Sequence, residues 1–208
     1  MKPEFITFTG LDARTDMSIV HGISNLYPVE WGVLFSPKRQ GLEPRYPGME
    51  VVDEIRKWSK DIRLAAHLCG RYAQRVQARM PLQLDLTGFK RAQVNCHEPD
   101  AGAISDFARD HNVAAIAQHR NLRFPEDERI SWLYDKSGGN GLSPTAWPTC
   151  PEEGLYGYAG GMGPDNVVET LERINAKGSY WIDMESKIRT DDWLDLGKCL
   201  AVCEAVFD

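Results

Sequence analysis

The sequence predicts an α/β protein, an eightfold parallel β/α (TIM) barrel that forms a single domain over residues 1–208. Eight short apolar runs recur about two dozen residues apart, and helical apolar patterns separate most of them. The runs are apolar almost throughout instead of alternating, which is typical of parallel strands covered on both faces. An open doubly wound sheet shares this order of elements and remains the alternative.

The strands are predicted from the apolar runs in chain order. They cover residues 5–9, 31–35, 63–68, 91–95, 113–118, 130–135, 155–159 and 179–184. Apolar residues at helical spacing follow the first, second and fourth run, at 17–27, 51–58 and 104–111. Each of these stripes can pack on a sheet.

Two further helices are predicted near the end of the chain. Pro164 and Asp165 are typical of a first helical turn, and an apolar face follows them up to Ile174. The last helix is expected after residues 190–192, with Cys199 and Cys203 on its apolar stripe. The connections after the fifth and sixth strand are charged or rich in glycine and proline, so we expect loops there.

The charge, hydropathy and cysteine content of the chain limit its possible partners and its compartment. The net charge is −6 and the basic residues are scattered, so we expect no nucleic acid, and no apolar run approaches the roughly 18 residues of a membrane span. The first residues lack the pattern of a secretory signal, and five cysteines without a C-x-x-C pair indicate reduced thiols. We therefore predict a cytoplasmic protein that binds neither nucleic acid nor a membrane; a homodimer stays open.

Polar residues follow the predicted strands, where a β/α barrel carries its functional groups. Asp135 ends the sixth strand, and a carboxylate there can transfer a proton, although it can also cap the next loop. His67, His97 and His119 lie at or just beyond three strand ends. They leave a divalent-metal site open, with Glu98 or Asp135 as oxygen ligands, although no compact spacing such as H-E-x-x-H supports it.

Two glycine clusters stand near these strand ends. Gly160 and Gly161 lead from the seventh strand into a helix, where bare backbone can approach an anion such as phosphate. A tight turn with positive φ is the alternative explanation. The second cluster, residues 137–141 with Gly139 at its centre, has the composition of a mobile active-site loop or of a plain flexible connection.

These segments, taken in order, resemble the phosphoribosylanthranilate isomerases over nearly the whole chain. The most specific match is residues 159–167, Ala-Gly-Gly-Met-Gly-Pro-Asp-Asn-Val, which resembles the family's Ala-Gly-Gly-Leu-x-Pro-Glu-Asn-Val. The other matching segments are 6–11, 32–38, 45–46, 92–95, 133–141 with Trp147, and 182–186.

The resemblance implies a barrel that performs an Amadori rearrangement without a cofactor, in tryptophan biosynthesis. It implies that Asp135 acts as general acid and that Arg45 helps to place the substrate. It also implies that Gly160 and Gly161 hold a phosphate. Asn95, Gly139 and Ser186 occupy the other positions at which we expect substrate binding.

Three positions depart from the family pattern. The family's cysteine base is replaced by Thr9, whose alcohol lacks the basicity of a thiolate near neutral pH. Glu185 puts a carboxylate beside the expected phosphate, and Asn95 replaces a histidine. We therefore predict that His67, His97 or Glu185 supplies the base, alongside Asp135.

The sequence thus predicts an isomerase or lyase acting on a small sugar-like or phosphorylated carbonyl compound. Three alternatives stay open. The chain could be a true phosphoribosylanthranilate isomerase with an altered base, a barrel that binds a small metabolite without chemistry, or a metal-dependent enzyme that uses the strand-end histidines.

Overall fold

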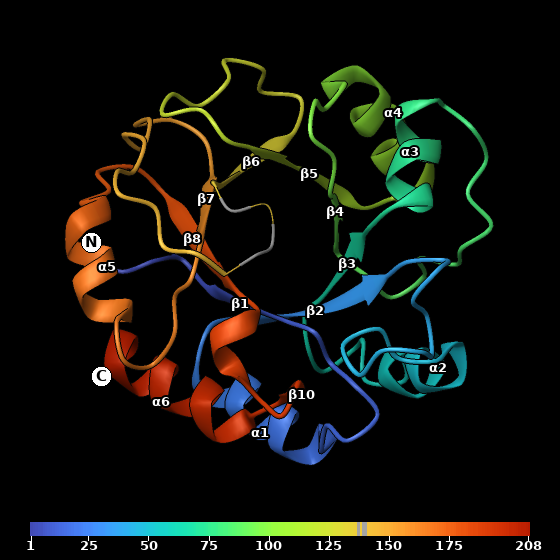
Figure 1. Ribbon diagram of the computed structural model, residues 1–208, viewed down its shortest axis with the longest axis horizontal. Helices are drawn as coiled ribbons and strands as arrows, with labels where there is room; N and C mark the ends of the chain where they lie inside the picture. The colour runs from blue at the N-terminus through green and yellow to red at the C-terminus, as the bar shows by residue number, and fades with distance from the viewer. Residues whose placement is uncertain (137, 139–140) are drawn as a thin grey trace.

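Eight parallel strands close into a barrel in the computed structural model, which describes residues 1–136, 138 and 141–208 (Figure 1). Each strand pairs with the next along the chain, and β8 pairs with β1. The strands are β1 (Ile6–Thr9), β2 (Val29–Phe35), β3 (Leu64–Leu68), β4 (Arg91–Val94), β5 (Ala114–His119), β6 (Ser131–Asp135), β7 (Tyr156–Ala159) and β8 (Tyr180–Met184). The predicted barrel is confirmed, and the open sheet is excluded.

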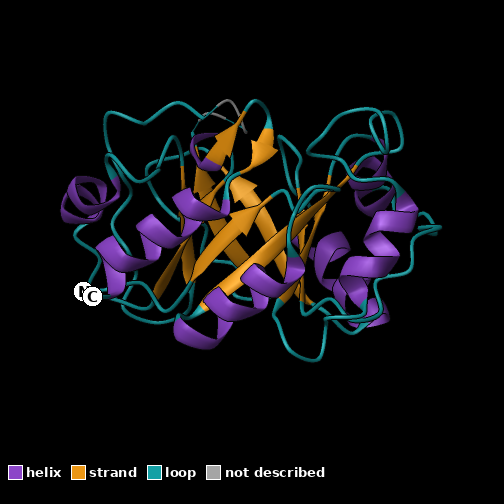
Figure 2. Ribbon diagram, turned by 90° about the horizontal axis from the view of Figure 1, so that it is seen from below, coloured by secondary structure: helices purple, strands orange, loops and turns teal. Residues whose placement is uncertain are grey.

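Helices surround the barrel (Figure 2). They are α1 (Met17–Leu26), α2 (Met49–Arg56), α3 (Arg71–Gln77), α4 (Ala101–His111), α5 (Val167–Ile174) and α6 (Leu196–Phe207). Aspartates begin three of them: the side chains of Asp16, Asp100 and Asp195 accept hydrogen bonds from backbone N–H groups of the first turn, at 2.9–3.1 Å. The predicted helix at Pro164 begins three residues later, at Val167, because residues 163–166 form a turn.

Loops replace helices after β5 and β6 in the described part of the chain, as predicted (Figure 1). Aromatic rings cover the strands there instead. The ring of Phe124 lies 4.6 Å from that of Tyr156, and the ring of Trp147 lies 5.8 Å from that of Tyr134. These rings bury the outer face of the sheet that helices cover elsewhere.

A short hairpin follows β8, after the 3-10 turn η1 (Ser186–Ile188). It consists of β9 (Arg189–Thr190) and β10 (Trp193–Leu194), joined by Asp191 and Asp192 with φ of 50° and 63°. Two consecutive left-handed residues are typical of a type I′ turn, which suits a tight hairpin. The last helix follows residues 190–192, as predicted, but a two-stranded hairpin that was not predicted comes before it.

Apolar and ionic side chains fill the barrel interior at the amino-terminal ends of the strands, which form its lower end. Trp181 and Leu133 lie in a cluster inside the strands. Below the mouth, Arg91 forms an ion pair with Glu30 at 3.0 Å and stacks over the Trp181 ring at 4.2 Å. Hollow space is therefore left toward the carboxyl ends of the strands.

Replacing Gly157 with alanine is expected to lower the free energy of unfolding by about 1–3 kcal/mol, because the interior at β7 is already full. A Cβ at Gly157 would lie 2.6 Å from Leu133 Cδ1 and against the Trp181 ring. Gly22→Ala on α1 is the matched control, since no atom lies within 4 Å of its Cβ position. Urea unfolding would compare the two, and equal stability changes would contradict this packing.

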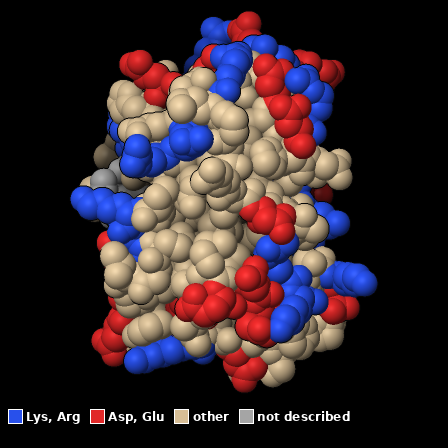
Figure 3. All heavy atoms as spheres, turned by 90° about the vertical axis from the view of Figure 1, so that its right-hand side faces the viewer, with Lys and Arg blue, Asp and Glu red and all other residues tan. Residues whose placement is uncertain are grey.

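The surface carries charges of both signs. On the side that bears α2 and α3, basic and acidic residues are interspersed and form no continuous basic patch (Figure 3). None of the described helices has the length and apolar character needed to cross a membrane. On α6, Cys199 and Cys203 are buried, as the apolar stripe predicts.

Candidate active site

A cavity of about 250 Å³ opens at the carboxyl ends of the strands. Residues from every strand end contribute to it, together with the loops after β2, β6, β7 and β8. The predicted site residues that line it are Thr9, His67, Asn95, Asp135, Gly160, Gly161, Glu185 and Ser186. Sequence patterns therefore located the mouth of the barrel.

Three carboxyl groups meet in this cavity. Asp135 at the end of β6 and Asp183 in β8 both pair with Ala159 of β7, so they stand two strands apart at the same level of the ring. Burial raises the pKa of Asp183 well above its ordinary value, and the carboxylates of Glu185 and Asp135 add to the shift. Burial also raises the pKa of Glu185, although Arg45 opposes the shift. The three groups are thus close enough to influence one another.

Asp135 is held by groups that donate to its two oxygens. The N–H of Gly138 donates to Oδ1 at 3.0 Å, and Gln118 Nε2 lies 3.4 Å from Oδ2. Asp183 accepts a hydrogen bond from Thr9 Oγ1 at 2.8 Å. Both carboxyl groups are therefore fixed in direction by neighbouring residues.

The floor of the cavity holds two buried polar side chains, His67 and Gln93. His67 Nε2 and Gln93 Oε1 have no hydrogen-bond partner among the described residues. Burial, together with the nearby charge of Arg91, lowers the pKa of His67 to about 3, so its ring is neutral at neutral pH. Gly32 makes room for this arrangement, because a Cβ there would lie 2.7 Å from Thr9 Oγ1 and 3.1 Å from His67 Nε2.

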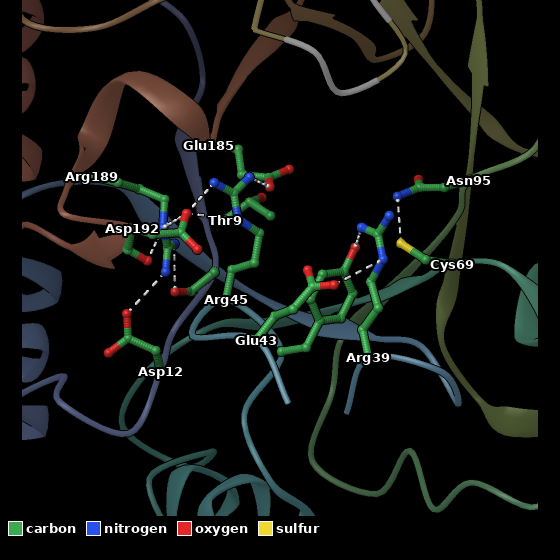
Figure 4. A network of polar contacts seen from close by, with 12 residues as sticks. Thr9, Asp12, Arg39, Glu43, Arg45, Cys69, Asn95, Glu185, Arg189 and Asp192 are labelled. Carbon is green, nitrogen blue, oxygen red and sulfur yellow. Dashed lines mark hydrogen bonds and ion pairs between the residues drawn. The ribbon is translucent and has the colours of Figure 1, made fainter. Parts of the chain in front are cut away.

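An ionic network crosses the rim between the loops after β2 and β8 (Figure 4). Arg45 donates to Glu185 Oε1 at 2.6 Å and also pairs with Asp192 of the hairpin. Arg189 donates to Asp12 Oδ2 at 3.0 Å, and this second pair is buried. The hairpin after β8 is thereby fixed to the loop after β1, and Arg45 faces two carboxylates.

A second polar cluster lies at the β3 and β4 ends of the same cavity (Figure 4). Asn95 Nδ2 donates to Cys69 Sγ at 3.2 Å, and Arg39 donates to the Tyr46 hydroxyl at 3.1 Å. Burial raises the pKa of the Cys69 thiol. Cys69 is thus a neutral lining group at neutral pH.

The glycine turn after β7 lies under the loop that follows β6. Gly160 and Gly161 have φ of 135° and 59°, which L side chains rarely adopt. A Cβ at Gly161 would lie 2.6 Å from the carbonyl oxygen of Gly141, and one at Gly141 would lie 2.9 Å from Ser186 Cβ. The three loops therefore touch one another around the turn. Gly139, expected to bind substrate, lies outside the described residues.

The barrel is similar in fold to solved structures of known enzymes. Phosphoribosyl anthranilate isomerase from Thermococcus kodakaraensis is 16% identical and covered over 99% of both chains, with a TM-score of 0.59. The isomerase from Thermotoga maritima is 12% identical, over 99% of this chain and 98% of that one, with a TM-score of 0.63. The chain has the fold of these isomerases. No protein-family model matches it, and no curated protein sequence does.

One isomerase structure with this fold holds a ligand. It is 10% identical, over 98% of this chain and 97% of that one, with a TM-score of 0.58, and it is a complex with reduced 1-(O-carboxyphenylamino)-1-deoxyribulose 5-phosphate. Thr9 stands at the position where the sequence resemblance places the cysteine base of these isomerases. Its hydroxyl donates to Asp183, so the residue at the family's base position acts here as a hydrogen-bond donor.

Two predicted site residues lie elsewhere. His97 is not among the cavity-lining residues; its side chain is 73% exposed beside Glu98, because the chain has left the barrel by this point. The expectation that His97 lies near the mouth is therefore wrong. Arg45 is also not a lining residue, since its guanidinium is paired with Glu185 and Asp192 at the rim.

The strand-end histidines do not converge on a metal site. His67 points into the barrel, whereas His119 packs among rings on its outer side, 4.7 Å from Phe124, and burial lowers its pKa to about 4. In the described part of the chain, no three His, Cys, Asp or Glu residues are grouped to hold a metal. These positions contradict the metal alternative built on His67, His97 and His119.

Four further polar groups line the cavity: Gln118 and Asp183 belong to the polar strand ends from which the candidates were chosen but were not selected, and Cys69 and Gln93 were missed. Three of them lie inside a strand, within runs that otherwise read as apolar. The available signal was the period of two: side chains at alternate positions share a face, so Gln93 lies on the same face as Asn95, and Asp183 on the same face as Glu185.

Proposed function

We propose that the cavity is the active site of an isomerase or lyase that moves a proton within a small sugar-like carbonyl compound. The observation that carries the proposal is the meeting of Asp135, Asp183 and Glu185 in one cavity. Gathering carboxyl groups away from water is costly, and such groups are typical of sites that transfer protons.

Asp135 and Glu185 are the groups that we assign to proton transfer. In the first half of the reaction Asp135 gives a proton to the carbonyl oxygen and Glu185 takes one from the neighbouring carbon, which makes an enediol. In the second half Glu185 returns its proton to the former carbonyl carbon, and Asp135 regains one from the other hydroxyl group. Burial raises the pKa of Glu185, which strengthens it as a base. His67 is less suited to this role, because a group with a pKa of about 3 is a weak base. Burial raises the pKa of Asp183 well above its ordinary value, which favours the protonated form that can donate a hydrogen bond to the substrate.

Exchange of substrate hydrogen for deuterium tests this proposal even when the product is unidentified. Common aldoses and ketoses would be incubated with the protein in D₂O, and deuterium entering beside the carbonyl group would be followed by NMR. We expect Asp135→Asn to slow the exchange by about a hundredfold. The exposed Asp61→Asn, away from the cavity, should leave the rate unchanged. Exchange that is equal with and without wild-type protein, or unaffected by Asp135→Asn, would refute the proposal.

A binding protein without chemistry is the second candidate. The observation in its favour is Thr9, whose hydroxyl is committed to Asp183 at the position where the resembled family has its base. For such a protein, a copurifying small molecule would bind but would not exchange hydrogen, and Asp135→Asn would leave its affinity unchanged.

We extend the proposal to the setting of the protein. The five cysteines are free, and three of them are buried, which suits a reducing compartment such as the cytosol. The substrate is a small molecule, since the cavity volume of about 250 Å³ is below the roughly 300–1,000 Å³ of drug-sized sites. Nucleic acid is not a partner in this proposal.

A further inference from the structure

We infer that the ligand of this cavity carries no phosphate: it is a polyhydroxylated compound that presents hydroxyl groups to the floor and a neutral or positively charged group to Glu185. That the ligand also carries a carbonyl group follows from the proposed function, and only this part of the inference rests on it. Its binding part stands on the charges and contacts of the cavity.

The charge of the cavity lining disfavours an anion. Asp135 and Glu185 line it beside Asp183, whose pKa is raised by burial, whereas Lys187 is the one lysine or arginine among its described lining residues. Lys187 is exposed, and its Cβ lies close to Gly163. A phosphate near Glu185 would meet a like charge a few ångströms away.

Arg45 does not compensate for this negative charge. Its guanidinium reaches Glu185 Oε1 at 2.6 Å and also binds Asp192, so two carboxylates already face one cation. A phosphate would have to displace one of these carboxylates. The Glu185 carboxylate thus lies at the position where the resembled family holds phosphate.

Hydrogen bonds from neighbouring residues also occupy polar groups of the glycine turn after β7. The N–H of Gly163 donates to Asn166 Oδ1 at 2.9 Å, so this amide at the start of α5 is already used. Asn166 Nδ2 and Ser143 Oγ both approach the carbonyl oxygen of Gly161, at 2.9 and 3.4 Å. The Gly163 amide is therefore not available to an anion, and the other two contacts fix the position of the turn.

The floor favours hydroxyl groups. His67 Nε2 and Gln93 Oε1 are buried in side chains that are each 2% exposed, and neither atom has a partner among the described residues. A buried polar atom without a partner costs free energy that a ligand hydroxyl can recover, because a hydroxyl both donates and accepts. A neutral imidazole does not require an anionic ligand.

Three probes with one carbon skeleton test the inference: ribitol, 1-amino-1-deoxyribitol and ribitol 5-phosphate, titrated into the protein by calorimetry. We expect the wild-type protein to bind ribitol and the amine more tightly than the phosphate. In Glu185→Gln, the preference for ribitol over the phosphate should fall by about tenfold, because one negative charge is lost and Arg45 is released from one partner. Glu54→Gln, an exposed change of equal charge on α2, should leave the preference unchanged.

Each outcome decides the inference. It is overturned if wild-type protein binds ribitol 5-phosphate more tightly than ribitol, or if ribitol and the amine fail to bind up to their solubility. It is also overturned if Glu185→Gln and Glu54→Gln shift the preference equally. The wild-type ranking needs no variant, so a misfolded Glu185→Gln would leave the test intact. Absence of deuterium exchange would refute the proposed reaction and leave this ranking untouched.

Discussion

Arg91→Leu is expected to lower the free energy of unfolding by about 3–5 kcal/mol, because it leaves the Glu30 carboxylate buried without its cation. The two side chains are 6% and 0% exposed and lie 3.0 Å apart beneath the cavity floor. Thr7 Oγ1 also donates to Glu30 at 3.0 Å, but a hydroxyl cannot neutralise the charge. Urea unfolding followed by circular dichroism measures the loss.

The double variant separates the charge effect from packing. When Glu30→Leu is combined with Arg91→Leu, no buried charge is left alone, so the double variant should be more stable than Arg91→Leu by itself. Arg109→Leu is the surface control: Arg109 pairs with Asp106 at 2.9 Å but is 71% exposed, and we expect a loss below about 1 kcal/mol. A loss in Arg91→Leu no larger than in Arg109→Leu would contradict the ion pair as an essential part of the floor.

This ion pair also bears on the site above it. Burial is the main cause of the lowered pKa of His67, and the charge of Arg91 adds to it, so the imidazole is neutral at the cavity floor. Conversely, burial lowers the pKa of Arg91, and Glu30 opposes that shift. The ion pair therefore adds to the effect of burial on the group that faces the ligand.

The strands could be predicted because both faces of each one are buried, which leaves a continuous apolar run in the sequence. Helix α3 (Arg71–Gln77) went unpredicted because only Ala73 and Val76 are buried on it, too few to form a visible stripe. The hairpin after β8 escaped for a similar reason, since strands of two residues have no period to detect.

The site was predictable only where it coincides with strand ends. Asp135 and Glu185 were found because polar residues interrupt apolar runs there, and both line the cavity. Gln93 lies inside β4, two positions before Asn95, where an isolated polar residue looks like part of the strand. His97 misled the prediction because distance along the chain does not show that the loop after β4 turns outward.

Asp183→Asn is expected to stabilise the folded protein at neutral pH. Asp183 is 7% exposed, and its pKa is raised well above the ordinary value by burial, with Glu185 and Asp135 adding to the effect. Asparagine has nearly the same shape, stays neutral at every pH, and keeps an oxygen that can accept from Thr9. The variant therefore avoids the cost of keeping a carboxyl group protonated in the folded state at pH 7.

The sign of the pH dependence distinguishes this cause from a general packing effect. Below about pH 4 the carboxyl group is protonated in both folded and unfolded chains, so wild type and Asp183→Asn should be equally stable. As the pH rises, the unfolded chain releases the proton first, and wild type loses stability until the raised pKa of the folded state is reached. The advantage of the variant should grow over this window by about 1.4 kcal/mol for each unit of displacement.

Unfolding by urea at a series of pH values measures this window, with the exposed Asp61→Asn as the control that should show no such trend. A stability difference that is constant with pH, or that favours wild type at neutral pH, would show that Asp183 is not held protonated. A gain in stability combined with slower deuterium exchange would mean that the protein keeps a destabilising carboxyl group at its cavity floor because the neutral acid donates a hydrogen bond to the substrate.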